Sequence, residues 1–191
     1  MRLASLKRLN AEQRAFQERL TTERGGAHGP FEVLLRSPLA GQRVEELATY
    51  CMRDCELPLR LLELALLIAA RHCDAQHSWT AHVDQAVAAG LDRAAVERLA
   101  RAEEPRFPRA DEVLLYRFAQ QALREHFVDD DTYGAALVEF GEQVLVDLVV
   151  SLGTFATLAL LLNTFEVDLR PGVEPPFPDV RGFRRVPPTH S

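Results

Sequence analysis

Residues 57–71 constrain the fold most, because they predict a helix that is apolar on nearly every side. Pro58 fits the first turn of such a helix, where a missing N–H costs no hydrogen bond. Between Leu61 and Ala70, the only ionisable residue is Glu63. A helix that is hydrophobic all round is stable only when other elements surround it. We therefore expect this helix at the centre of the protein.

The rest of the chain also favours helices. Asp92 is placed to cap a short helix, and Gly90 to end the one before it. There is no hairpin signal and no run of strands. The predicted fold class is therefore all-α. Apolar residues recur at helical spacing in residues 44–53, 79–89, 111–127, 133–140 and 143–164.

The 18 residues from 148 to 165 carry no charged side chain. An apolar run of about 18 residues is the shortest that signals a membrane span. Asp147 and Glu166 flank this run, and no basic residue lies close enough to anchor it. The run also contains several small polar residues. We expect a helix buried in a core or at a subunit contact, and no membrane partner.

Composition limits the class of protein. The chain has 191 residues with a formal net charge of -6, whereas a nucleic-acid binder would normally show a basic stripe. Its N-terminus lacks the apolar core of a signal peptide, and three cysteines fit a reducing compartment. We therefore expect a cytoplasmic protein that does not bind nucleic acid.

The two ends differ from the middle. Residues 1–27 predict a charged, helical N-terminal extension, which a glycine-rich segment separates from the main domain at 28–170. Residues 171–191 are too rich in proline to form a helix. They predict either a disordered tail or an arm that lies over another subunit.

Glu63 and His82 are the first candidates for a functional site. A buried carboxylate must find a partner or hold its proton. His82 follows Trp79 by three positions, so it is expected on the apolar side of its helix. Structural alternatives remain open: Glu63 can pair with Arg60 or another Arg, while His82 and Trp79 can be ordinary core residues.

The order of these elements resembles the carboxymuconolactone decarboxylase and alkyl hydroperoxidase D-like superfamily over roughly residues 28–170. The resemblance implies an alkyl hydroperoxidase D-like helical bundle that forms dimers, trimers or hexamers, with a pocket near the Glu and the His. It rests on residues 30–38 (PFEVLLRSP), 57–63 (LPLRLLE), the Trp-x-x-His helix through residue 91, and residues 153–169.

The peroxidase branch of this superfamily carries Cys-x-x-Cys-x-x-x-His. Counted back from His82, the two cysteine positions fall on Ala75 and Ser78, so this chain resembles the branch that lacks the motif. Cys73 lies two positions too early and has no second cysteine beside it. Because a dithiol peroxidase needs an attacking and a resolving thiol, this activity is the disfavoured alternative.

Many non-peroxidase relatives have an aromatic residue and a Glu before the Trp, where this chain has His77 and Ser78. The resemblance implies a cofactor-independent, decarboxylase-like lyase acting on a small carboxylated or lactone-type metabolite. His82 would carry the proton, since an imidazole titrates near neutrality, and Glu63 would assist it. The expected substrate-binding residues are Trp79, His77, Ser78 and Cys73.

Other interpretations stay open. His72, Cys73, His77, His82 and Glu63 supply metal-binding atom types, but their spacing matches no common zinc signature, so no metal is expected. Cys51 and Cys55 are four residues apart, yet small buried side chains are the simpler interpretation. A non-catalytic helical oligomer that binds a ligand or a partner is the remaining alternative, and a filled pocket would favour it.

Overall fold

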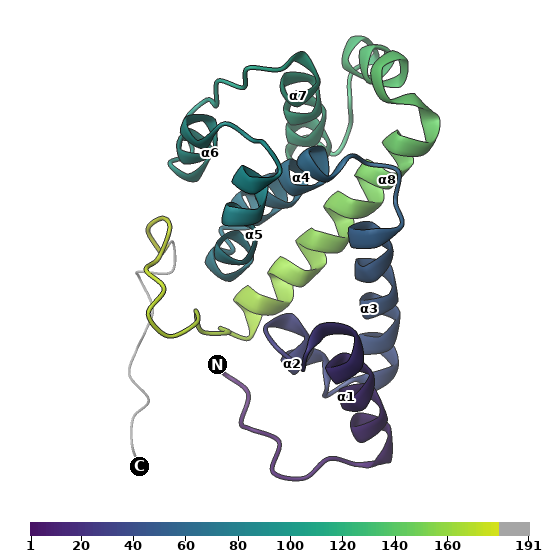
Figure 1. Ribbon diagram of the computed structural model, residues 1–191, viewed down its shortest axis with the longest axis vertical. Coiled ribbons are helices and arrows are strands. Elements are labelled where there is room, and N and C mark those ends of the chain that lie inside the picture. Colours follow the sequence, from purple (N-terminus) through teal and green to yellow (C-terminus); the bar gives the residue numbers. More distant parts are fainter. Residues whose placement is uncertain (180–191) are drawn as a thin grey trace.

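The computed structural model describes residues 1–179 and confirms the all-α prediction, since this part of the chain contains helices and no strand. Figure 1 shows the long helix α8 crossing the molecule beside α4, with the other helices around this pair. The helices are α1 (Ala11–Arg24), α2 (Pro30–Leu34), α3 (Pro38–Arg53), α4 (Leu59–His72), α5 (Gln76–Ala88), α6 (Arg93–Ala100), α7 (Ala110–Arg124) and α8 (Asp130–Thr164).

Helix α4 is the central element, as its sequence predicted. All ten residues from 61 to 70 are buried, including Glu63. The helix packs against α3, α5, α6, α7 and α8. Pro58 stands at the N-cap, one position before the first turn. The Asp92 cap is also present, because its side chain accepts a hydrogen bond from the N–H of Ala95 at 2.8 Å.

Arg60 joins α4 to α7. Its guanidinium contacts Asp111 at 2.5 Å and also pairs with the fully buried Glu112. This arrangement decides one of the alternatives left open by the sequence. Arg60 is engaged by α7, so it does not neutralise Glu63 on the same helix.

Helix α8 consists of two helical parts joined by a kink at Gly141. This glycine has φ 78° and ψ 168°, a left-handed φ that side chains rarely adopt. The sequence predicted two helices separated between residues 140 and 143, and the kink lies at that place. The Asp129 side chain accepts from the N–H of Thr132 at 2.7 Å and caps the first part.

By length and composition, α8 is the one helix in residues 1–179 that is apolar enough to cross a membrane. Half of its most apolar window is buried inside the fold. Asp147 lies on the buried face, where it accepts hydrogen bonds from the hydroxyl of Tyr50 at 2.7 Å and the N–H of Glu56 at 2.9 Å. That contact raises the pKa of Tyr50 to about 12.

The N-terminal extension is part of the main fold. Phe16 and Leu20 on α1 are buried in the core, and α1 packs against α3. Glu45 on α3 is fully buried and accepts hydrogen bonds from Arg19 and Arg24 of α1. Although burial alone would raise it, these partners and Thr49 hold the pKa of Glu45 below its usual value.

Residues 171–179 fold back onto their own chain. Phe177 is buried and packs edge-on against Trp79, with ring centroids 5.8 Å apart. The Arg71 guanidinium lies 4.6 Å from the Phe177 ring centroid, and Gln76 donates a hydrogen bond to the Phe177 carbonyl at 2.6 Å. This part therefore packs against its own chain, and the arm over another subunit stays a prediction. The rest of the predicted tail, residues 180–191, lies outside the described residues.

Replacing Arg60 by Met should lower the free energy of unfolding by about 3 kcal/mol, because it leaves the buried Glu112 without its cation. Urea denaturation followed by circular dichroism measures this change. The exposed Arg43→Met should cost under about 0.5 kcal/mol. Equal losses for both variants would contradict a structural role for the buried pair.

We propose that the exposed side of α8 packs against another copy of the chain. Val146, Val149 and Leu160 are each more than half exposed and recur at helical spacing with the exposed Gly153. Sedimentation velocity at micromolar concentration should show an oligomer. Val149→Glu should yield a smaller species, whereas Val138→Glu, before the kink, should not. A folded wild-type monomer would refute this proposal.

Candidate functional site

Glu63 and His82 form a side-chain pair across the contact between α4 and α5. The Nδ1 atom of His82 lies 3.1 Å from Oε2 of Glu63. Glu63 is fully buried, whereas the side chain of His82 is 20% exposed. The expected proximity of the two residues is thus observed, and the carboxylate has an imidazole rather than an arginine as its partner.

The second oxygen of Glu63, Oε1, is buried without a hydrogen-bond partner in the described part of the chain. A buried acceptor that lacks a partner costs about 1–3 kcal/mol. Purely structural carboxylates usually have both oxygens satisfied, as Glu45 does on α3. Glu112 also has a buried oxygen without a partner among the described residues, but it pairs with Arg60 between two helices. Glu63 differs because its partner is a histidine that lines a cavity, and this makes it a candidate functional group.

The pairing also determines which atom of His82 is free. An ionised Glu63 accepts a hydrogen bond from Nδ1–H, which leaves the lone pair on Nε2. The His82 ring packs edge-on against Phe155 of α8, with centroids 6.1 Å apart. Contacts from α4 and α8 therefore hold the ring in one orientation.

His82 lines a cavity of about 840 Å³, which is within the range of small-molecule sites. The walls come from α1 to α5, α8, the loop before α2 and the segment after α8. The floor is largely apolar and includes Leu66, Phe155 and Leu158. The polar side chains of the lining are Arg24, His28, Glu32, His77, Ser78, His82, Gln85, Asp168 and Arg170.

Helix α5 presents two different faces. Ser78, Ala81, His82 and Gln85 line the cavity at helical spacing, while Trp79 and Ala86 point into the core. His82 therefore lies on the face of α5 that lines the cavity, next to the buried face that carries Trp79 and Ala86. The sequence analysis grouped His82 with Trp79 because two side chains three residues apart on a helix point in directions that differ by only about 60°.

The structure places the predicted site residues in three different environments. His82, His77 and Ser78 line the cavity, and Glu63 lies behind His82 without lining it. Trp79 lies outside the lining, because its indole is 2% exposed and packs against Phe177. The expectation that Trp79 walls the pocket needs correction: its ring is part of the core.

Cys73 also lies away from the cavity. It follows the end of α4, and its carbonyl accepts a hydrogen bond from Asn163 of α8 at 2.6 Å. Burial raises the pKa of the Cys73 thiol, with a further contribution from the charge of Asp74. The thiolate is the nucleophile in cysteine chemistry, so this environment makes Cys73 less reactive than an ordinary cysteine.

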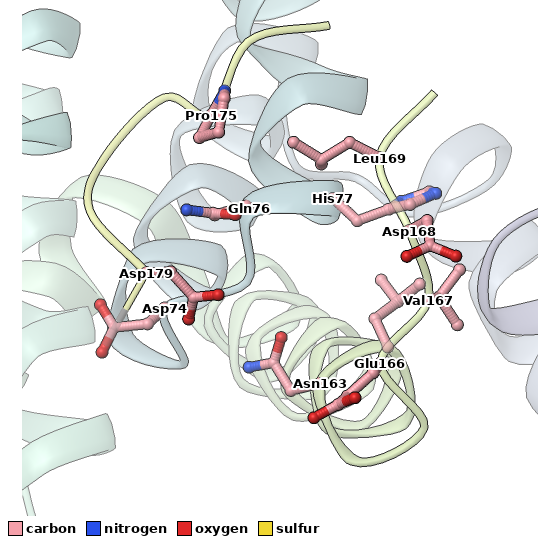
Figure 2. A pocket seen from close by; sticks show the side chains of 11 residues that line it. Asp74, Gln76, His77, Asn163, Glu166, Val167, Asp168, Leu169, Pro175 and Asp179 are labelled. Atoms are coloured by element: carbon pink, nitrogen blue, oxygen red, sulfur yellow. The ribbon is translucent and has the colours of Figure 1, made fainter. Parts of the chain in front are cut away.

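His77 stands between this cavity and a smaller one of about 390 Å³. In Figure 2, its side chain points from α5 toward the extended segment that carries Asp168 and Leu169, and these two residues also line both cavities. Burial lowers the pKa of His77, and the charge of Arg170 lowers it further. Both effects favour the neutral form of the His77 imidazole.

Several lining residues were not found from the sequence. Gln85 follows His82 by three positions, so helical spacing alone was a sufficient signal. His28 lies in the segment 25–30, which was interpreted only as a separator between domains. Arg24 and Arg170 come from the predicted extension and from the end of the predicted domain, and nothing local marks them as cavity residues.

No group of three or more His, Cys, Asp or Glu side chains in residues 1–179 is arranged to hold a metal ion. The five residues named from the sequence, His72, Cys73, His77, His82 and Glu63, are therefore not gathered into one such group within these residues. The dispersal has a simple cause. Helix α4 ends at His72, and Asp74 has φ 51°, so the chain turns sharply between the proposed ligands.

Comparison with known proteins gives a fold relative. No protein-family model matches the sequence, and no curated protein does. A solved structure from Agrobacterium tumefaciens, a protein of unknown function described as a candidate antioxidant defence protein AhpD, is similar with a TM-score of 0.63. The two chains are 20% identical, and the match covers 74% of this chain and 96% of that chain. Within the described residues, the protein therefore has the helical fold of alkyl hydroperoxidase D-like proteins.

Proposed function

We propose that this protein is a cofactor-independent enzyme, similar to carboxymuconolactone decarboxylase, that acts on a small carboxylated or lactone-type metabolite. The observation that carries the proposal is the His82–Glu63 contact of 3.1 Å, with His82 lining a cavity of about 840 Å³. A buried acid that supports a cavity histidine is a common arrangement for proton transfer.

His82 is the proposed catalytic residue. Its Nε2 atom takes a proton from the carbon next to a carbonyl or carboxylate, or returns one to the enolate-like intermediate that a decarboxylation leaves. The pair requires no external electron donor, because only a proton and, in the decarboxylation, carbon dioxide are exchanged.

Glu63 is a positioning residue. It does not line the cavity, so it acts on the substrate only through His82. Its carboxylate selects the Nδ1–H tautomer and stabilises the imidazolium that forms when Nε2 accepts a proton.

The thiol-dependent peroxidase alternative has little support. The counterparts of the two reactive cysteines are Ala75 and Ser78, and burial raises the pKa of Cys73. Cys51 is buried, and the Cys55 thiol donates to the carbonyl of Cys51 at 3.0 Å. Neither residue lines the cavity, so no thiol reaches the place where a substrate would bind.

The non-catalytic alternative is a helical protein that only binds a ligand. A filled pocket would have favoured it, but the space beside His82 is open. An open cavity fits both a binding protein and an enzyme. What favours the enzyme is the contact of the buried Glu63 with His82, since a carboxylate behind a cavity histidine is an arrangement used for proton transfer.

His82→Ala and Glu63→Gln should each reduce turnover by about 10²-fold or more, the usual scale for a lost acid–base group. The double variant should lose little more than either single one, because the two residues act as one unit. Mass spectrometry with a panel of carboxylated metabolites and lactones, using wild type and variants side by side, would identify the substrate and measure these losses.

The matched control is His72→Ala, since His72 is exposed and does not line the cavity. It should retain wild-type turnover. Circular dichroism would verify that each variant is folded. Full activity of folded His82→Ala on the identified substrate would rule out the proposed mechanism.

The protein should not consume hydrogen peroxide above the buffer rate with a dithiol reductant such as dihydrolipoamide. The physical reason is that no pair of thiols lines the cavity. A coupled absorbance assay measures this rate. Peroxide turnover that disappears in Cys73→Ser would replace acid–base catalysis with thiol chemistry.

A further inference from the structure

Arg24 is a cavity residue whose guanidinium is held by several contacts. It is the last residue of α1, and Gly25 turns the chain away from the helix axis with φ 73°. Its side chain is 24% exposed and lines the same cavity as His82. The residue lies in the N-terminal extension, outside the range 28–170 that resembles the enzyme superfamily.

Two of the three guanidinium nitrogens of Arg24 are fixed by α3. Nε donates to Glu45 at 3.1 Å, and Nη2 donates to the hydroxyl of Thr49 at 2.7 Å and to the carbonyl of Glu45 at 3.3 Å. Thr49 in turn donates to Glu45 at 2.7 Å. The face of the guanidinium lies on Phe31, 4.5 Å from the ring centroid. Arg24 is therefore held in one geometry without a ligand.

The third nitrogen, Nη1, has no hydrogen-bond partner in residues 1–179. Guanidinium groups only donate, and they match the oxygens of a carboxylate. A rigid donor loses less entropy when it binds, so a pre-oriented Nη1 favours anion recognition.

The charge balance around Arg24 leaves positive charge for a ligand. Arg19, Arg24 and Arg43 share two carboxylates, Glu45 and Glu46, so three cations face two anions. The second cavity cation, Arg170, adds to this excess. Of the two lining acids, Asp168 is paired with the Met1 ammonium at 2.8 Å, which leaves Glu32.

We propose that Arg24 binds the carboxylate of a small apolar acid through Nη1, while the body of the ligand lies on Phe31 and Phe155 and reaches His82. The role of His82 in this assignment rests on the proposed function. The binding of the carboxylate by Arg24 does not depend on it. The occupant is a monocarboxylate rather than a neutral ligand, because the lining carries two guanidinium groups, those of Arg24 and Arg170, and a guanidinium matches the geometry and charge of a carboxylate.

The test uses 4-fluorobenzoate as the probe and 4-fluorobenzamide as its neutral analogue, each titrated into the full chain and followed by ¹⁹F NMR. Wild type should bind the benzoate more tightly than the benzamide. Arg24→Gln should weaken benzoate binding by about 10-fold or more, the scale of a lost charge-assisted contact, and should leave benzamide binding within twofold. In a parallel ¹H–¹⁵N NMR titration of the labelled protein, the ring signals of His82 should shift when benzoate is added.

Arg19→Gln is the matched control. Arg19 donates to the same Glu45 carboxylate, so its loss disturbs the same buried cluster, but it does not line the cavity. It should keep wild-type affinity for the benzoate. Arg24→Lys keeps the charge but loses the planar donors, so it should bind the benzoate more weakly than wild type even if Arg24→Gln does not fold.

Equal binding of the two probes to wild type would overturn the proposal. So would the same loss in Arg19→Gln as in Arg24→Gln, or benzoate binding that leaves the His82 signals unchanged. Because the measurement is binding, Arg24-dependent affinity in a protein that turns over no carboxylate would support the Arg24 assignment and count only against the proposed catalysis.

Discussion

The burial of residues 61–70 in α4 is the constraint on which the rest of the structure depends. Ten consecutive residues are out of solvent, so every ionisable group on that stretch requires a partner from another helix. Glu63, the only ionisable group on that stretch, is matched by His82 of α5, and Arg60, just before the stretch, is matched by the acids of α7. Electrostatics thus orders the helices around α4, and one of the two contacts also places an imidazole beside a cavity.

Much of the fold and part of the site could be predicted from the sequence, because both depend on local patterns. The all-apolar run predicted the central helix, and the isolated Glu63 predicted a buried acid near His82. The end of α7 was missed by three residues, because His126 adopts φ 66° and ends the helix despite the apolar Phe127. The apolar Phe127 continues the helical pattern, so the sequence does not indicate the left-handed turn at His126.

What the sequence could not predict depends on contacts between distant segments. Trp79 was assigned to the cavity, but Phe177, about a hundred residues later, packs against it in the core. Arg24 belongs to a charged extension that looks like a solvated helix, and only the burial of Glu45 on α3 turns it toward the body of the fold. Composition cannot show which of many arginines meets a buried acid.

The contact between Trp79 and Phe177 has a practical consequence. Trp79 is the only tryptophan in the chain, and it is covered by a residue of the proline-rich C-terminal segment. Its emission spectrum therefore reports whether that segment is seated, independently of any assay of the cavity. Undocking would expose the indole to water and shift its emission to the red, so the protein carries its own optical probe of how the C-terminal segment is packed.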